Sequence, residues 1–312
     1  MKWFLEDKVE PHSTKISHGD EVLFFGSCFS DHILQKGQQA GLKFLNTKFG
    51  TIFHPLPLAR IISKSLVKSK EAIVFENNDR YYSWEASSKW NGNESDSFKS
   101  EIESEYATVG EKLKTAKFIF ITLGTAKEYA LSDGLVVANC HKMPADNFTS
   151  SLSKLKVLTE SYTNLVHALH AKFPDLEIVL TVSPVRHSKD GLTTNNRSKA
   201  RLLLLCEELA QMDKVSYFPA YEMIVDELRD YRFYTSDLVH PNEEGIKYVW
   251  NKFRETYFDS KTNELTDKVS KYRSYFAHRP INEPTVNEQN IRLNKQKELD
   301  DFLRQHPQII WK

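Results

Sequence analysis

The chain has 312 residues, of which 42 are basic and 42 are acidic. This balance offers no electrostatic basis for binding nucleic acid or an anionic membrane surface. The length accommodates one large domain or two small ones with a sizeable core. No apolar run approaches the length of a membrane span, so we expect neither a nucleic-acid partner nor a membrane association.

The cysteines Cys28, Cys140 and Cys206 are too few and too scattered for a disulfide framework. No CxxC or Cys/His cluster suggests zinc, and we expect no metal and no other cofactor. The N-terminus reaches acidic residues after three apolar ones, so it lacks the apolar segment of a signal peptide. Unpaired cysteines without an export signal predict a cytoplasmic protein.

Five apolar stretches of strand length alternate with stretches of helical periodicity. The expected strands are Val22–Gly26, Leu42–Leu45, Lys117–Leu123, Glu177–Val182 and Val215–Phe218. The expected helices are Asp31–Ala40, Ser150–Lys172, Arg197–Met212 and Asn242–Phe258. Because alternating strands and helices form βαβ units, we predict an α/β fold: a three-layer α/β/α sandwich around a mostly parallel five-stranded sheet.

Two regions lie outside this alternation. Residues 47–115 include Pro55, Pro57 and many aromatic side chains, and we interpret them as an insertion that covers the active edge of the sheet. From Ser260 the chain is polar. Helical patterns at Asn263–Phe276 and Val286–Arg304 flank a proline-containing link at Arg279–Pro284. We therefore expect a main domain at residues 15–260 and a C-terminal helical appendage at residues 261–312.

Two candidate nucleophiles, Ser27 and Cys28, directly follow the strand expected at Val22–Gly26. In open α/β sheets, ligands and chemistry collect at the carboxyl ends of the strands, which is where this turn lies. Either side chain can act as a nucleophile when another residue supplies a base. The alternative is that Cys28 is a small buried hydrophobic residue, which is the usual role of a free cysteine.

A candidate base lies near the other end of the main domain, where Asp237 and His240 precede the last long helix. At this spacing the carboxylate can fix the imidazole tautomer and stabilise its protonated form, which leaves the other ring nitrogen free as a base. Pro241 rigidifies the loop directly after the histidine. The alternative is that Asp237 caps a turn and His240 is a surface histidine.

A nucleophile after the first strand, together with Asp-x-x-His before the last helix, resembles the SGNH/GDSL esterase superfamily. More narrowly, Gly-Ser-Cys-Phe-Ser at residues 26–30 resembles the signature of the GSCFA family, an SGNH-like group. The similarity extends to stretches at 49–56, 122–125, 181–186 and 217–241, and it covers roughly residues 15–260. It implies a flavodoxin-like three-layer fold and a hydrolase of esters or related acyl groups.

The register of the resemblance favours the cysteine as the nucleophile. When the superfamily's Gly-Asp-Ser pattern is laid over the chain without a gap, Cys28 takes the serine position and Ser27 takes that of the aspartate. A thiol is a good nucleophile near neutral pH when an imidazole and a helix N-terminus assist it. Ser27 depends more strongly on His240, because its hydroxyl is otherwise unreactive.

The oxyanion donors are less clearly marked. The superfamily's Gly-x-Asn block supplies an asparagine to the oxyanion, but here Gly124 is followed by Thr125 and alanine. That donor is either missing or replaced by Thr125. The backbone amides of the turn from Gly26 to Cys28 and the amide of Gly50 are the other candidates.

Two further residues are candidates for contacting the substrate. His54 precedes a proline and lines the pocket in one interpretation, whereas it is simply an exposed loop histidine in the other. Arg186 follows the fourth strand and can bind a carboxylate or phosphate in a bidentate manner. The alternative for Arg186 is a salt bridge to Glu222 or Asp226.

We therefore expect an SGNH-like hydrolase that cleaves an O-acyl ester on a carbohydrate or small molecule. Cys28 or Ser27 attacks the carbonyl, His240 transfers the proton, and Asp237 orients His240. An acyltransferase on the same fold and a non-catalytic ligand-binding scaffold are the alternatives, since a fold alone does not select among them. The sequence leaves the oligomeric state open.

Overall fold

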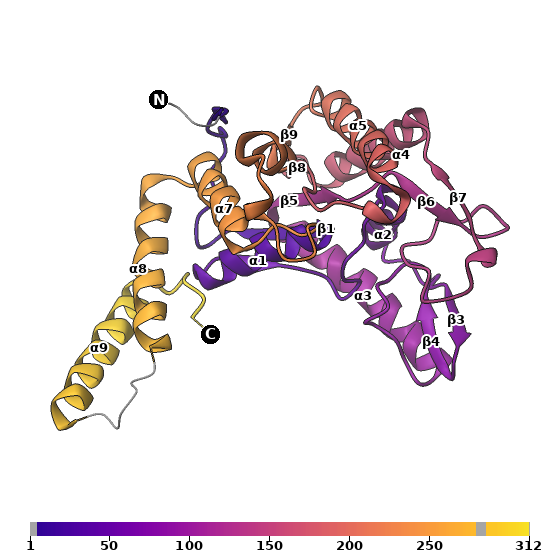
Figure 1. The fold of residues 1–312 in the computed structure, drawn as a ribbon. Coiled ribbons are helices and arrows are strands. Elements are labelled where there is room, and N and C mark those ends of the chain that lie inside the picture. Colours follow the sequence, from indigo (N-terminus) through magenta and orange to yellow (C-terminus); the bar gives the residue numbers. More distant parts are fainter. Residues whose placement is uncertain (1–4, 279–284, 312) are drawn as a thin grey trace.

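The computed structural model describes residues 5–278 and 285–311. Its central sheet contains the strands β1 (Glu21–Gly26), β2 (Lys43–Leu45), β5 (Ala116–Leu123), β8 (Glu177–Val182) and β9 (Val215–Tyr217) (Figure 1). Neighbouring strands are parallel throughout, in the order β2-β1-β5-β8-β9. The predicted five-stranded parallel sheet is confirmed. Taken in chain order these strands run 2-1-3-4-5, which is the flavodoxin-like arrangement.

The strands are apolar along their length because both faces of the sheet are covered. In β1, Val22 and Phe24 face one hydrophobic cluster while Leu23 and Phe25 face the other. β5 and β8 repeat this alternation. Side chains alternate with a period of two, so a strand buried on both faces has a nearly continuous apolar sequence.

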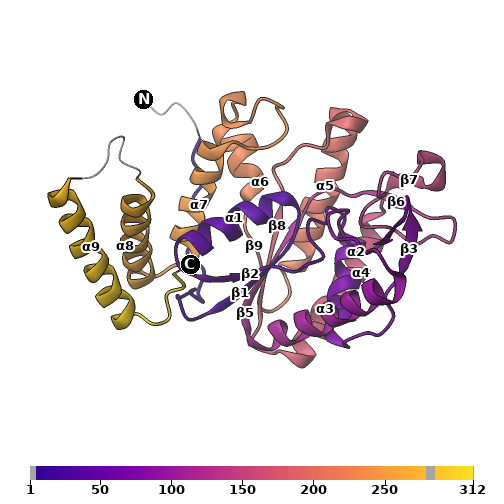
Figure 2. The same ribbon diagram turned by 90° about the horizontal axis from the view of Figure 1, so that it is seen from below.

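Helices cover both faces of the sheet, which confirms the three-layer sandwich (Figure 2). On one face lie α1 (Cys28–Gln39) and α7 (Glu243–Tyr257). The other face is covered by α2 (Pro55–Leu66), α3 (Ser95–Thr115), α4 (Leu155–Lys172) and α5 (Leu192–Leu209). The shorter helical segments are Ala145–Asn147, Ser188–Asp190, α6 (Ala220–Glu222), Met223–Leu228 and Tyr231–Phe233.

The segment at 47–115 differs from the insertion that we expected. Its helices α2 and α3 contribute buried residues to the same hydrophobic cluster as the sheet, so much of the segment belongs to the sandwich itself. Between them, β3 (Val74–Asn77) and β4 (Arg80–Ser83) form an antiparallel hairpin at the side of the molecule (Figure 1). A second small antiparallel pair joins β6 (Lys127–Ala130) to β7 (Thr149–Leu152). Because β7 takes up residues 149–152, α4 begins at Leu155 and not at Ser150 as predicted.

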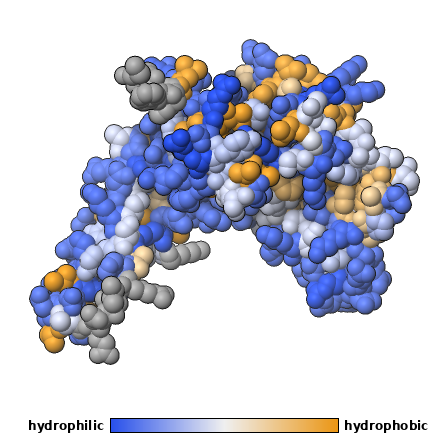
Figure 3. Space-filling view, in the orientation of Figure 1, coloured by the Kyte–Doolittle hydropathy of each residue, from blue (hydrophilic) through white to orange (hydrophobic). Residues whose placement is uncertain are grey.

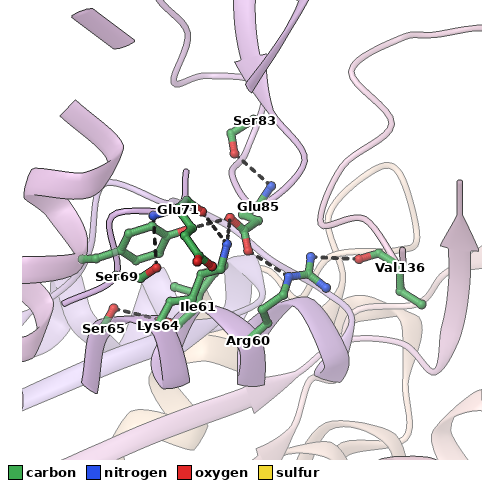
Figure 4. A network of polar contacts seen from close by, with 10 residues as sticks. Arg60, Ile61, Lys64, Ser65, Ser69, Glu71, Ser83, Glu85 and Val136 are labelled. Atoms are coloured by element: carbon green, nitrogen blue, oxygen red, sulfur yellow. Dashed lines mark hydrogen bonds and ion pairs between the residues drawn. The ribbon is translucent and has the colours of Figure 1, made fainter. Parts of the chain in front are cut away.

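A buried carboxylate ties the chain after β4 to the helical layer. Glu85 is completely buried, and α2 supplies two cations to it: Arg60 Nε lies 2.8 Å and Lys64 Nζ 3.0 Å from its oxygens (Figure 4). The hydroxyl of Tyr106, on α3, also donates to Glu85, at 2.5 Å. The charge of Glu85 is therefore compensated by two cations and further satisfied by a hydroxyl donor, as a buried charge requires.

The C-terminal part contains α8 (Ser260–Ala277) and α9 (Val286–Gln305), which project from the sandwich as an arm (Figure 1). The two helices share a small hydrophobic cluster of their own that includes Val269 and Leu299. The last described residues return to the main body, where the N–H of Ile310 donates to Gly41 O at 2.9 Å. The predicted link at 279–284 lies outside the described residues.

In the described part of the chain, no helix is long and apolar enough to span a membrane. The face drawn in Figure 3 is mainly hydrophilic, and its hydrophobic side chains form separate small groups. Buried hydrophobic residues instead concentrate in the two clusters on either side of the sheet.

Candidate active site

The turn that carries the two candidate nucleophiles packs tightly against the neighbouring strand. Gly26 ends β1 with φ +120°, and a Cβ on this residue would lie 2.1 Å from Thr122 O. The N–H of Ser27 donates to the same carbonyl at 3.0 Å. Only glycine fits this backbone geometry. Helix α1 begins two residues later, at Cys28. Cys28 thus lies between β1 and β5, where the strand order reverses and ligands of such folds collect.

Ser27 and Cys28 differ in their access to solvent. Ser27 is 1% exposed, and its Oγ has no hydrogen-bond partner among the described residues. Cys28 is partly exposed. Burial and the negative charge of Asp31 raise the pKa of the Cys28 thiol, while the backbone amides of Cys28 and Phe29 and the charge of Lys199 act in the opposite direction. Of the two candidates, Cys28 is the one that a substrate can reach.

Asp237 and His240 form a hydrogen-bonded pair. Asp237 Oδ2 lies 2.7 Å from His240 Nδ1, and Oδ1 accepts from the Thr235 hydroxyl and from the backbone N–H groups of Val239 and His240. These donors, with Thr235 first, hold the pKa of Asp237 far below its usual range. An ionised Asp237 keeps the proton of neutral His240 on Nδ1 and leaves Nε2 as the free base. Asp237 therefore both caps its turn and orients the imidazole.

The Asp237–His240 turn lies at the same edge of the sheet as Cys28. The backbone N–H of Arg186, which follows β8, donates to Val239 O at 3.2 Å. Burial lowers the pKa of His32 in α1, and the neighbouring charge of His240 lowers it further, so the turn lies close to this helix. Among the described residues, His240 forms no hydrogen bond to Ser27 Oγ or Cys28 Sγ, so the resting structure does not join the candidate base to either candidate nucleophile.

The predicted oxyanion residues around Gly124 are engaged in the fold. The N–H groups of Gly124 and Thr125 both donate to Phe53 O, at 2.8 and 3.0 Å. The Thr125 hydroxyl is buried, shares a 3.0 Å hydrogen bond with Ser198 Oγ, and accepts from the N–H of Lys127. These amides and this hydroxyl already have partners, unlike the first amides of α1, which have no intrahelical partner.

The structure places His54 in a buried structural network. His54 is 4% exposed and caps α2: its Nδ1 accepts from Leu56 N at 3.2 Å, and its Nε2 lies 2.9 Å from Ser153 Oγ. The Ser153 hydroxyl donates onward to Glu128. Burial lowers the pKa of His54 to about 4. Both ring nitrogens are occupied, so His54 holds α2 in place and has no free nitrogen for a ligand.

Arg186 is held by aromatic rings. Its guanidinium carbon lies 4.9 Å from the ring centroid of Tyr231 and 4.5 Å from that of Tyr234. In the described residues no ion pair joins it to Glu222 or Asp226; Glu222 instead accepts from the Tyr217 hydroxyl. Arg186 thus stabilises the segment leading to the Asp237–His240 turn.

A polar cavity of about 430 Å³ opens beside α1. Its lining includes Asp31, one turn after Cys28, together with Gly50, Thr51 and Trp90. This volume is within the range of small-molecule sites, although the lining is more polar than is usual for them. Within the described ranges, no group of three or more His, Cys, Asp or Glu side chains is arranged to hold a metal ion.

One buried residue at this edge of the sheet, Lys199, was not predicted from the sequence. Lys199 on α5 is 1% exposed, and its Nζ donates to Gly124 O and Ser183 O, each at 2.6 Å. These carbonyls directly follow β5 and β8. A lone lysine in a helix usually lies on the solvated face, so nothing in the sequence distinguishes Lys199 from a surface residue.

The fold and the site define a flavodoxin-like α/β protein with a nucleophile after the first strand and an Asp–His pair before the last helix of the sandwich. The sequence model of the GSCFA family matches residues 21–253, and the chain belongs to this family. A comparison with curated proteins found no match.

The solved structures to which this chain is similar include carbohydrate esterases. A family two carbohydrate esterase from Clostridium thermocellum in complex with cellohexaose has 10% identity and a TM-score of 0.38, covering 85% of this chain and 67% of that one. A carbohydrate esterase family 3 protein from Talaromyces cellulolyticus has 10% identity and a TM-score of 0.37, covering 80% and 99%. The acetyl xylan esterase Est2A from Butyrivibrio proteoclasticus has 10% identity and a TM-score of 0.39, covering 84% and 66%. The family assignment rests on the family model alone.

Proposed function

We propose that this protein hydrolyses an ester, with Cys28 as nucleophile, His240 as general base and acid, and Asp237 as the residue that orients His240. The observation that carries the proposal is the arrangement of these groups. A partly exposed thiol begins α1 at the switch point of the sheet, and the 2.7 Å Asp237–His240 pair lies at the same edge.

In the proposed reaction, His240 Nε2 takes the thiol proton as Cys28 Sγ attacks the acyl carbonyl. The N–H groups of Cys28 and Phe29 at the start of α1 stabilise the oxyanion, because the first amides of a helix have no intrahelical partner. The N–H groups of Gly124 and Thr125 are not free for this role, since both donate to Phe53 O. His240 then returns the proton to the leaving alcohol, which yields a thioester on Cys28. Water, deprotonated by His240, hydrolyses the thioester and restores the thiol.

The proton transfer requires the Asp237–His240 turn and Cys28 to approach each other when substrate binds. Both side chains of the pair are about half exposed, 50% for Asp237 and 44% for His240, so neither is enclosed by surrounding side chains. Catalytic hydrogen bonds are often long in the free enzyme and tighten in the substrate complex. The separation in the resting state is compatible with the proposed roles.

We further propose that the alcohol part of the substrate is a carbohydrate or another polar small molecule. The cavity beside α1 supports this choice because its lining combines polar groups such as Asp31 and Thr51 with the indole of Trp90. Polar side chains can accept hydrogen bonds from sugar hydroxyls, and an aromatic face can cover the apolar side of a sugar ring.

The absence of a His240–Cys28 contact among the described residues favours one competing function, in which the same cavity binds an acylated ligand without turnover. The two functions differ in what His240 does. Ligand binding that survives the loss of His240, without cleavage of any ester, supports the binding function.

The test is the release of p-nitrophenol from p-nitrophenyl acetate by the wild type and by Cys28→Ala, Ser27→Ala and His240→Ala. We expect Cys28→Ala to be inactive, His240→Ala to lose about 10²–10⁴-fold in rate, and Ser27→Ala to remain active. Full activity in His240→Ala contradicts the proposal. Adding an alcohol acceptor separates hydrolysis from acyl transfer, because a transferase is accelerated by the acceptor and forms a new ester.

A further inference from the structure

We infer that one buried water molecule is a fixed part of this fold, bound between the first turn of α1 and the ends of β5 and β8. Its ligands are the hydroxyl groups of Ser30 and Thr181, with the hydroxyl of Thr122 as the third partner. The proposed reaction uses none of these residues, and the site is separate from the polar cavity beside α1. The inference therefore does not depend on the proposed role of Cys28.

The site is a small cavity inside the hydrophobic cluster that joins α1 and α7 to the sheet. Its volume is about 10 Å³. The lining is apolar, with side chains such as Phe29 and Phe253, except for the hydroxyl-bearing residues Ser30, Thr122 and Thr181. A space of roughly 10–15 Å³ is what one water molecule needs. The cavity therefore fits a single water and nothing larger.

Two hydroxyl groups in this lining have no protein partner. Ser30 and Thr181 are each 4% exposed, and neither Ser30 Oγ nor Thr181 Oγ1 has a hydrogen-bond partner among the described residues. A buried hydroxyl without a hydrogen bond costs free energy, and nearly all such groups in folded proteins are bonded to protein or to ordered water. Because both residues line the same cavity, one water bonds to both hydroxyls at once.

The pattern of the two strands explains why hydroxyls gather at this point. Thr122 in β5 and Thr181 in β8 are paired in the register of the sheet. On the same face, the residues two positions earlier are Phe120 and Val179, which belong to the hydrophobic cluster. The apolar row of each strand thus ends in a threonine where the strand approaches the carboxyl edge. Ser30, the third residue of α1, lines the same cavity.

The chemistry of the lining favours water over a metal ion. In the described part of the chain, the residues that line the cavity carry no charged side chain. Ca²⁺ and Mg²⁺ need about six or more oxygen ligands, usually with carboxylates among them. A hydroxyl group can both donate and accept a hydrogen bond, which matches the two donors and two acceptor sites of a water molecule.

The bound water completes the attachment of α1 to the sheet. The N–H of Ser27, directly before α1, donates to Thr122 O at 3.0 Å, which joins the start of the helix to β5. A water shared by Ser30 and Thr181 extends this attachment to β8. Because Ser30 is two residues after Cys28, the water helps to fix the helical turn that carries the thiol.

The direct test is a high-resolution crystal structure of the full chain. We expect electron density for one water within hydrogen-bond distance of both Ser30 Oγ and Thr181 Oγ1. A cavity without density overturns the inference, and so does a hydrogen bond from either hydroxyl to a protein atom in place of the water. This measurement needs no substitution, so it does not depend on whether a variant folds.

A second test counts the long-lived bound waters in solution by oxygen-17 magnetic relaxation dispersion. The double variant Ser30→Ala/Thr181→Val removes both hydroxyls while it nearly retains the side-chain volumes. We expect it to hold one long-lived water fewer than the wild type, because an apolar cavity of this kind stays dry. An unchanged number of waters in the folded variant overturns the inference.

The matched control is Ser65→Ala/Thr256→Val, which makes the same two changes at buried hydroxyls that have protein partners. Ser65 Oγ donates to Ile61 O and Thr256 Oγ1 donates to Lys252 O, each at 2.8 Å. We expect this control to keep the wild-type number of long-lived waters. An equal loss in both double variants overturns the inference, because the loss is then not specific to the cavity.

Discussion

Asp237 Oδ2 and His240 Nδ1 are 2.7 Å apart, and the same carboxylate accepts the backbone N–H groups of Val239 and His240 through its other oxygen. One side chain thus fixes both the backbone of the turn and the orientation of the imidazole. The proposed base is held by its own turn and does not depend on a distant element for its tautomer.

This relationship predicts that Asp237→Asn lowers ester hydrolysis by about 10–100-fold, less than His240→Ala, because asparagine keeps the turn's acceptor but loses the charge that stabilises the imidazolium. The measurement is kcat for p-nitrophenyl acetate. Asp230→Asn is the matched control, since Asp230 also caps an exposed turn by accepting from Arg232 N at 2.8 Å but has no histidine partner. Equal activities of the two variants contradict the assigned role.

The tight turn before Cys28 leads us to predict that two glycine substitutions lower the free energy of unfolding by very different amounts. Gly26→Ala places a Cβ 2.1 Å from Thr122 O at φ +120°. We expect the free energy of unfolding to fall by about 3 kcal/mol or more, because the backbone of β1 or β5 must move to relieve this clash. Gly134 also has a positive φ, +86°, but nothing lies within 4 Å of an added Cβ. Gly134→Ala should therefore cost about 1–2 kcal/mol, for backbone strain alone. Urea unfolding of both variants checks this order, and a smaller loss in Gly26→Ala contradicts it.

The buried Glu85 network predicts that Glu85→Ala lowers the free energy of unfolding by about 3–5 kcal/mol, because it leaves Arg60 and Lys64 without their shared partner (Figure 4). The matched control is Glu111→Ala. Glu111 also pairs with two lysines, Lys68 and Lys114, but it is exposed, so we expect a much smaller change. Thermal and urea unfolding measure both variants, and comparable losses would show that Glu85 is not held as described.

The burial of His54 leads us to predict that the free energy of unfolding falls on acidification. Its pKa is lowered to about 4 by burial, below the ordinary value of about 6.5 in an unfolded chain. The unfolded state therefore binds the proton first, and stability is lost as the pH falls from about 6.5 to about 4. The shift corresponds to about 3 kcal/mol. His54→Asn, which retains a favoured helix cap, should show a shallower loss over this window in urea unfolding. His278→Asn, at an exposed position, should keep the wild-type slope; equal slopes in both variants contradict the prediction.

The central sheet could be predicted from the sequence because burial on both faces makes each strand a continuous apolar run. The segment at 47–115 could not be interpreted as well. Pro55 and Pro57 indicated a loop, yet both lie in the first turn of α2, where the missing N–H of a proline is not needed. The polar sequence of α3 obscured the buried residues Phe98 and Ile102, whose helical spacing is the signal that identifies it.

The candidate site likewise contains some residues that could be placed from the sequence and others that could not. Cys28, Asp237 and His240 could be placed at one edge because strand order determines where the carboxyl ends meet. Lys199 could not, because its position depends on carbonyl groups from two separate strands. The structural role of His54 likewise depends on Ser153, a residue far away in the sequence. Contacts of this kind are set by tertiary packing, which a local pattern does not encode.

The most direct test of the proposed hydrolase is to trap its covalent intermediate. Wild type and Cys28→Ala are mixed with p-nitrophenyl acetate, quenched in acid within the first turnover, digested and analysed by mass spectrometry. We predict one acetyl group on the peptide that contains Cys28 in the wild type, located on Cys28 itself, and none in Cys28→Ala. An acetyl group on Ser27, or undiminished turnover in Cys28→Ala, would contradict the account.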